Sequence, residues 1–222
     1  MQPEYSKYIH GFHRRDYLPH LKVAGAAYFV TFRLADSLPK EVLLRIKTEL
    51  EQTVFPEDAT LDERTEHLRQ LRRRKIEHSL DQGAGQCWLR HPEMASLLAG
   101  ALKHFDGERY KLRAWVIMPN HVHVLVAPLK EFSLGAIVKS WKQFLATRAK
   151  KILAIPPGRF WQPESYDHWT RDADERERVI SYIHQNPVKA KLCQRPEECP
   201  WSSAYPVQTD SINPGRLEAC AT

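Results

Sequence analysis

The feature that most constrains the fold is the run MPNHVHVLV at residues 118–126. Its apolar and β-branched residues are typical of a buried strand, in which residues i and i+2 point to the same face. His121 and His123 therefore share one face, and the valines beside them face the other way. Two adjacent imidazoles on a rigid strand can grip a divalent metal. The alternative is a pair of ordinary hydrogen-bonded histidines on a sheet surface, so the metal interpretation needs support from the rest of the chain.

Three further stretches have the composition of strands. Residues 110–117 precede the histidine run, and Pro119-Asn120 between the two marks a tight turn, so a hairpin is expected. Residues 26–34 are almost continuously apolar, as in a central strand. The aromatic stretch 160–169 is expected to include a fourth, short strand.

Helical periodicity separates these strands. The expected helices cover residues 39–51, 92–105, 133–153 and 172–186. Ser37, Ser133 and Asp172 stand where N-caps are expected, and Pro187 should stop the last helix. The order approximates a βαββαβ plan. The sequence therefore predicts an α+β fold, a ferredoxin-like or RRM-like antiparallel sheet with helices packed on one face, to which a helical insertion and a C-terminal helix bearing Tyr182 are added.

The domain boundaries follow from these elements. Residues 26–190 form the main domain, with a helical insertion at about 53–85. A basic, aromatic arm occupies residues 1–25, and residues 191–222 form a C-terminal extension. Within the insertion, Thr60 and Glu63 have the spacing of a capping box, so a helix should start there and stop before Gly83.

The charge balance favours a polyanionic partner. The 222 residues carry 33 Lys and Arg against 27 Asp and Glu, a net charge of +6 with a pI near 9.1. No apolar run could span a membrane, and the first residues do not have the apolar core of a secretory signal. The four cysteines form no CxxC pair, so neither a disulfide framework nor a zinc knuckle is expected, and a reducing cytoplasm is the default compartment.

The last helix offers a nucleophile. Tyr182 and Asn186 are four residues apart and therefore lie on one side of a helix, at the border of its apolar stripe. A tyrosine that attacks a DNA phosphate conserves the bond energy in a phosphotyrosine ester, but its phenol must first be activated. The alternative is an amphipathic tyrosine at the edge of the core, and the chain's other tyrosines, among them Tyr166, compete for the role.

Taken together, these segments resemble a known family. Residues 118–126 resemble the metal-binding strand of single-tyrosine HUH transposases, the IS200-like transposases. The run YIHQNPVKA at residues 182–190 resembles the tyrosine helix of their REP-associated branch. The same branch is matched by FWQP at 160–163, YDH at 166–168 and YFVTFRL at 28–34. The similarity covers most of residues 8–205, and the first two motifs in this order are highly specific.

The resemblance implies a catalytic domain with a defined site. His121 and His123 would bind Mg²⁺ or Mn²⁺, with Asn186 as the third protein ligand. Tyr182 would attack single-stranded DNA, leaving a 5′-phosphotyrosine and a free 3′-OH. The family acts on hairpin-forming repeated palindromic elements of bacterial genomes. The expected partner is therefore single-stranded or hairpin DNA, bound by a monomer or homodimer in the bacterial cytoplasm, in association with the nucleoid.

Basic side chains should hold this DNA. The candidates are Arg14, Arg15, Arg72, Arg73, Arg74, Lys139, Lys142 and Lys189. The chain departs from its relatives at Lys191, where family members often carry the glycine that eases a helix-end turn. The insertion is absent from the shortest relatives.

Two other functions remain open at this stage. The chain could bind hairpins without cutting them, or it could be a metal hydrolase that uses water in place of Tyr182. The sequence is also compatible with a Tyr182 that completes either its own site or that of a partner chain.

Overall fold

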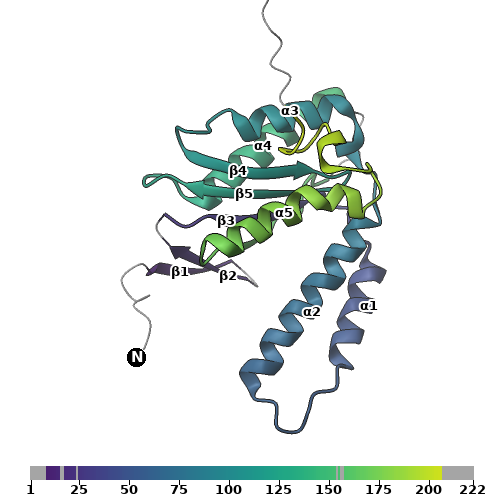
Figure 1. Cartoon of the computed structure of the whole chain (residues 1–222). Coiled ribbons are helices and arrows are strands. Elements are labelled where there is room, and N and C mark those ends of the chain that lie inside the picture. Colours follow the sequence, from purple (N-terminus) through teal and green to yellow (C-terminus); the bar gives the residue numbers. More distant parts are fainter. Residues whose placement is uncertain (1–8, 16–17, 24, 154, 156–157, 207–222) are drawn as a thin grey trace, which may run out of the picture.

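An antiparallel four-stranded sheet forms the centre of the computed structural model, which describes residues 9–15, 18–23, 25–153, 155 and 158–206 (Figure 1). The strand order is β4-β5-β3-β6. The bounds are β3 (Tyr28–Arg33), β4 (Tyr110–Ile117), β5 (His121–Pro128) and β6 (Tyr166–Trp169). The predicted α+β fold is confirmed, with β3 as a central strand between β5 and β6. This spatial order is the one that a βαββαβ chain adopts in a ferredoxin-like sheet.

Two helices cover one face of the sheet. They are α3 (Pro92–Lys103) and α4 (Leu134–Ile152). Alternate residues of the strands, such as Val122 and Val124, point to this face and are fully buried against Leu98 and Trp141. Two of the expected caps are confirmed: Ser133 accepts a hydrogen bond from the backbone of Ala136 in α4, and Asp172 accepts one from the backbone of Glu175 in the last helix.

The opposite face is covered by α5 (Ala173–Lys189). Ile183 is fully buried there against Phe29 and Leu125, which belong to the other parity of β3 and β5. His121 and His123 have the same parity as Leu125, so they face α5. The helix that carries Tyr182 therefore lies over the histidine face of the sheet.

A pair of helices projects from the sheet between β3 and α3 (Figure 1). These helices are α1 (Lys40–Glu51) and α2 (Leu61–Asp81), and they pack against each other. The expected capping box is present, because the backbone of Thr60 donates to Glu63 at 2.9 Å and that of Glu63 donates to Thr60 at 3.3 Å. A short 3₁₀ turn, η2 (Trp88–Arg90), then leads into α3.

The ends of the chain add two smaller elements. A hairpin of β1 (Ile9–Arg15) and β2 (Leu18–Val23) lies beside β6, in a stretch where the sequence showed no strand period; the structure describes only its backbone. After α5, a 3₁₀ turn η3 (Pro196–Glu198) leads to a segment that extends the sheet beyond β4. There the backbone of Ile117 donates to Trp201 at 2.8 Å, and that of Ser203 donates to Trp115 at 2.9 Å.

Two expectations about helix ends are wrong. Ser37 does not cap α1, which starts after Pro39, because its hydroxyl donates to the carbonyl of Leu34 at 2.8 Å. Pro187 does not stop α5, which continues to Lys189. A proline this close to the end removes one backbone hydrogen bond and leaves the last turn intact.

The turn after α5 keeps the geometry that glycine would favour. Lys191 has a φ of 57° and therefore adopts the left-handed conformation. In that conformation the Cβ of lysine adds a steric cost that glycine avoids.

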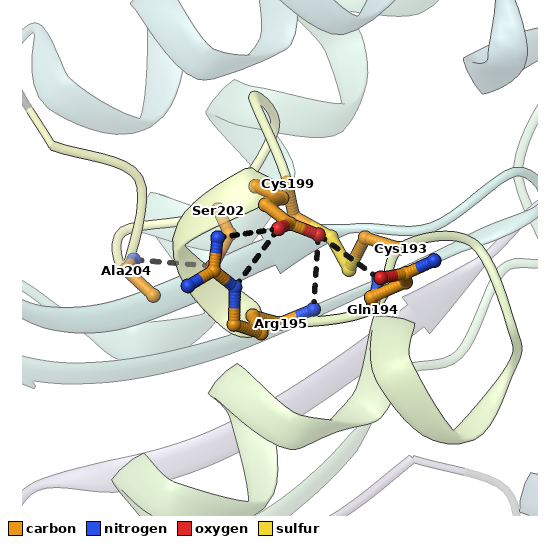
Figure 2. Close-up of a disulfide and its surroundings, with 7 residues drawn as sticks. Cys193, Gln194, Arg195, Cys199, Ser202 and Ala204 are labelled. Atoms are coloured by element: carbon orange, nitrogen blue, oxygen red, sulfur yellow. Dashed lines mark hydrogen bonds and ion pairs between the residues drawn. A yellow bond between two sulfur atoms is a disulfide. The ribbon is translucent and has the colours of Figure 1, made fainter.

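The expectation about cysteines is also wrong, because Cys193 and Cys199 form a disulfide (Figure 2). Six residues separate the two cysteines, and the intervening 3₁₀ turn brings their Cα atoms to 6.0 Å. The same loop is held by Glu198, which accepts from the Arg195 guanidinium at 2.9 Å (Figure 2). Cys87 is a buried free thiol, and Cys220 lies outside the described residues.

Candidate functional site

The two histidines at the start of β5 are buried and face each other. Their exposed fractions are 1% for His121 and 0% for His123. The two Nε2 atoms are 3.1 Å apart, and the ring centroids are 4.7 Å apart. This separation is suited to two ligands of one metal, since neighbouring ligand atoms at Mg²⁺-type distances lie about 3 Å apart.

Two polar side chains orient the imidazoles through their other nitrogens. Asn120 donates through its amide to the carbonyl of Ala84 at 2.9 Å, so its oxygen must be the atom that lies 2.7 Å from Nδ1 of His121. His121 is therefore the Nδ1–H tautomer, and the lone pair of its Nε2 faces Nε2 of His123. Nδ1 of His123 lies 2.8 Å from the hydroxyl of Thr31. Partners of this kind are what fix metal-binding histidines in proteins.

Both histidines are neutral over the physiological range. Burial lowers the pKa of His121 to about 3, with the charge of Arg33 acting in the same direction. Burial also lowers the pKa of His123 well below its usual value, with further contributions from His121 and Arg73. Neutral imidazoles are the form that binds metals, so a cation does not compete with an imidazolium charge at this site.

Tyr182 and Asn186 project from α5 toward this pair. The amide of Asn186 donates to the Tyr182 hydroxyl at 3.3 Å, and the centroid of the tyrosine ring lies 5.5 Å from that of His123. Phe29 of β3 holds both rings, because it stacks on His123 at 5.4 Å and meets Tyr182 edge-on at 5.7 Å. The structure thus brings the four predicted active-site residues to one place.

Helix α2 also borders the site formed by the histidines of β5 and by Tyr182 and Asn186 of α5. The sequence alone did not predict this contact. Arg73, Glu77 and Asp81 are spaced four residues apart and line one side of α2. Arg73 donates to Glu77 at 2.9 Å, and its guanidinium lies 5.3 Å from the Phe29 ring and 5.1 Å from the Tyr166 ring. The spacing was visible in the sequence, but its meaning depends on how α2 docks.

The charges of this side act on Tyr182. Burial raises the pKa of the Tyr182 phenol above its usual value, and the carboxylates of Glu77 and Asp81 raise it further. Arg73 opposes them. Burial likewise raises the pKa of Asp81 to about 6, with the neighbouring charge of Glu77 adding to the effect. The Tyr182 phenol is therefore protonated in this structure, and a cation beside it would favour loss of the proton.

A divalent cation fits the donors that are present. The side-chain oxygen of Asn186 is buried without a hydrogen-bond partner. The Nε2 atoms of His121 and His123 contact each other at 3.1 Å, and a cation between them would replace that contact. Among the described residues no three His, Cys, Asp and Glu side chains are already gathered as a metal cluster. A centre built from two imidazoles and an amide needs no such cluster, and oxygen and nitrogen donors of this kind suit Mg²⁺ or Mn²⁺.

The predicted DNA-contacting residues fall into four groups. Arg73 and Lys189 lie at the centre, the latter with its ammonium 5.2 Å from the Tyr182 ring. Arg72 and Arg74 are exposed on α2. Lys139 and Lys142 belong to α4, on the opposite face of the sheet. The side chains of Arg14 and Arg15 lie outside the described residues.

Lys142 has a structural role in this position. Its ammonium donates to the carbonyls of Gln162 and Pro163 at 2.7 and 2.9 Å, which ties α4 to the segment before β6. Burial lowers its pKa to about 8.

A cleft of about 590 Å³ runs between α2 and the β6–α5 segment. Its lining combines arginines, glutamates and one aromatic ring, contributed by Glu66, Arg69, Gln70, Arg73, Arg74, Glu77, Tyr166, His168, Arg171 and Glu175. Because Arg73 and Glu77 belong both to this lining and to the surroundings of Tyr182, the cleft opens beside Tyr182.

A comparison with known families found a match. Residues 92–186, from α3 to Asn186, match the family model described as transposase IS200-like. This segment, less than half of the chain, is similar to the IS200-like transposases. The matched segment contains His121, His123, Tyr182 and Asn186, but neither β3 nor the α1–α2 hairpin.

Individual relatives of this chain are distant. It is 24% identical over 99 residues to the REP-associated tyrosine transposase of Escherichia coli (strain K12). That match covers 43% of the chain and 55% of the relative, so the matched region spans about half of the curated protein's length. A solved structure described as the REP-associated tyrosine transposase bound to a REP hairpin has a TM-score of 0.47 and 17% identity. It covers 86% of this chain and 80% of that one.

None of the described helices is long and apolar enough to cross a membrane.

Thr31, Arg33, Asn120 and Asp81 are site residues that the sequence interpretation missed. For two of them a signal existed: Thr31 and Arg33 are polar residues two apart in an otherwise apolar strand, so they share the face that pairs with His123 and His121. Asn120 was interpreted only as a turn residue, although its side chain is fully buried.

Proposed function

We propose that this chain is a metal-dependent endonuclease and strand transferase that acts on hairpin-forming single-stranded DNA through a 5′-phosphotyrosine. The observation that carries the proposal is the meeting of Tyr182 and Asn186 with the His121–His123 pair. These four residues come from two segments that are far apart in the sequence. Packing of the core alone does not require a tyrosine to meet three side chains of the kind that bind metals. The match of residues 92–186 to the transposase IS200-like family model supports a DNA substrate.

The chemistry is a transesterification at phosphorus. The Tyr182 oxygen forms a bond to the phosphorus while the bond from phosphorus to the 3′ oxygen breaks, and that oxygen takes up a proton as the free 3′-OH. Glu77, which faces the phenol from α2, accepts the phenolic proton. Arg73 stabilises the negative charge of the phosphate and of the developing phenolate.

The histidine pair and Asn186 would hold the divalent cation. When bound, Mg²⁺ or Mn²⁺ supplies Lewis-acid polarisation of a phosphate oxygen. The protein's own part is to keep the imidazoles neutral and correctly oriented, which burial and the contacts with Asn120 and Thr31 achieve.

The cleft beside Tyr182 carries the single strand. Its arginines neutralise backbone phosphates, and the Tyr166 ring offers a surface for base stacking. The exposed arginines of the α1–α2 hairpin are candidates for gripping the hairpin stem, and the basic N-terminal arm adds further charge.

The test uses an oligonucleotide that folds into a hairpin with single-stranded arms and is labelled at its 3′ end, with its sequence chosen from any palindromic repeats found beside the gene. With Mn²⁺ or Mg²⁺ the wild-type protein should cleave it and retain the label in a covalent adduct. Tyr182→Phe should bind the oligonucleotide and form no adduct. Tyr205→Phe, an exposed tyrosine away from the centre, is the matched control.

Other outcomes point elsewhere. An adduct that persists in Tyr182→Phe would move the nucleophile, with Tyr166 the next candidate. Tight binding without cleavage under either metal would favour a protein that holds hairpins and does not cut them. Turnover that survives Tyr182→Phe but is lost in His123→Ala would assign the nucleophile to water.

A further inference from the structure

A buried carboxylate oxygen of α2 points at the histidine pair without a partner. Oδ1 of Asp81 is inaccessible to solvent and makes no hydrogen bond. It lies 3.9 Å from Nε2 of His121. Because Asn120 fixes His121 as the Nδ1–H tautomer, that Nε2 has no proton to donate, and the contact sets one lone pair against another.

A second buried oxygen near the histidine pair also has no hydrogen-bond partner. The side-chain oxygen of Asn186, whose residue is 1% exposed, is the other buried side-chain polar atom without a partner among the described residues. Such orphan atoms are uncommon in folded proteins and call for an explanation, of which a missing ion is one. Two orphans beside one pair of metal-type imidazoles point to the same ion.

The distances suit ligands of one cation. At the Mg²⁺-type ligand distance, neighbouring donors of an octahedral ion lie about 3 Å apart and opposite donors about 4 Å apart. The 3.1 Å between the two Nε2 atoms and the 3.9 Å from Asp81 to His121 fall in this range. Charge also favours a carboxylate, because two neutral imidazoles and an amide leave a buried dication without any negative ligand.

We propose that Asp81 is a fourth protein ligand of the divalent cation, beside His121, His123 and Asn186. The inference rests on the metal dependence proposed above. Asp81 lies outside the segment that matches the family model. It is the last residue of α2, where the α1–α2 hairpin returns to the sheet. The cation therefore ties the α1–α2 hairpin to the sheet, and metal binding fixes the position of the cleft that the hairpin borders.

The first experiment measures Mn²⁺ binding by the full-length protein without DNA, by isothermal titration calorimetry. Asp81→Asn should weaken Mn²⁺ binding by about 10- to 100-fold, the range seen when a supporting metal-site residue is lost. Asp62→Asn, an exposed residue in the first turn of the same helix, should bind as the wild type does. Mn²⁺ should also slow tryptic cleavage within the α1–α2 hairpin of the wild type but not of Asp81→Asn.

Failures of the two proposals can be told apart. Wild-type binding of Mn²⁺ with unchanged affinity in Asp81→Asn overturns the role of Asp81 alone. A wild-type protein that binds no Mn²⁺ overturns the whole metal centre, including the metal dependence of the proposed function.

A second variant separates direct ligation from a simple effect of charge. Asp81→Cys places a thiolate at the same position, and Cd²⁺ bound to a thiolate gives an ultraviolet charge-transfer absorbance. Asp81→Cys should show this band on addition of Cd²⁺, and Asp62→Cys, which shares the background of native cysteines, should not. Equal absorbance changes in the two variants would show that residue 81 does not reach the cation.

Discussion

Replacing Asn120 with alanine should weaken the fold and the metal centre together. Its side chain is fully buried, accepts from His121 at 2.7 Å and donates to the carbonyl of Ala84 at 2.9 Å. Alanine leaves both partners buried and unpaired, and each such group costs about 1–3 kcal/mol. We expect the free energy of unfolding without metal to fall by about 2–4 kcal/mol.

The expected loss of Mn²⁺ affinity in Asn120→Ala follows from the tautomer of His121. Without Asn120, His121 is free to rotate and to place its proton on Nε2, so Mn²⁺ affinity should fall by about 10- to 100-fold. At a Mn²⁺ concentration 100 times the wild-type Kd, the metal stabilises the wild type by about 2.7 kcal/mol. At the same concentration it stabilises a tenfold weaker variant by about 1.4 kcal/mol. Urea unfolding of both proteins, with and without Mn²⁺, measures the two terms separately.

The matched control is Thr170→Val. Thr170 is also buried, at 3% exposed, and donates through its hydroxyl to the carbonyl of Ala27 at 3.1 Å, in a contact that involves no site residue. This variant should lose stability and keep the full increment from Mn²⁺. An Asn120→Ala protein that gains as much from Mn²⁺ as the wild type would refute the orienting role of Asn120.

Three further predictions concern the backbone and one lysine. Gly85→Ala should destabilise the fold by more than about 2 kcal/mol, since its φ is +87° and a Cβ would lie 2.7 Å from the carbonyl oxygen of Asp36. Gly83→Ala, at φ +69° with nothing closer than 3.9 Å, is the control, and equal losses in urea unfolding would contradict the steric part. Lys191→Gly should stabilise by about 0.5–1 kcal/mol by relieving the left-handed φ of 57°, and a lowered Tm would count against this. The pKa of Lys142 is about 8 in the folded state and about 10.4 in the unfolded state, so the unfolded state binds more protons between these pH values. The contribution of Lys142 to stability therefore rises with pH in this window, and it is lost as the pH falls through 8. The unfolding free energy of the wild type relative to Lys142→Met should therefore increase from pH 7.5 to 9.5, and a constant difference would speak against the lowered pKa.

Local sequence patterns were sufficient for the sheet and for the pairing of the motifs. Alternation in β5 placed His121 and His123 on one face, and the four-residue spacing in α5 placed Tyr182 beside Asn186. Both relations depend only on the period of the element that carries them. They do not depend on how the other elements of the chain pack.

The rest depended on contacts between distant segments. Thr31 meets His123 across 92 residues, and Asp81 reaches His121 only because α2 docks against the site. Periodicity within one helix cannot give that docking. The disulfide was missed for a similar reason, because the 3₁₀ turn that brings Cys193 to Cys199 leaves no mark in cysteine spacing alone.

The central place of β3 has a consequence for how the chain folds as it is synthesised. Among the strands of the four-stranded sheet, β3 leaves the ribosome first. Its neighbour β5 follows about ninety residues later, as the separation of 92 residues between Thr31 and His123 shows. Until then β3 is an apolar strand with two open edges, a state prone to aggregation. The α1–α2 hairpin, whose contacts are local, can form during that interval. Sheet assembly should therefore be the slow step, completed only when β6 pairs with the free edge of β3.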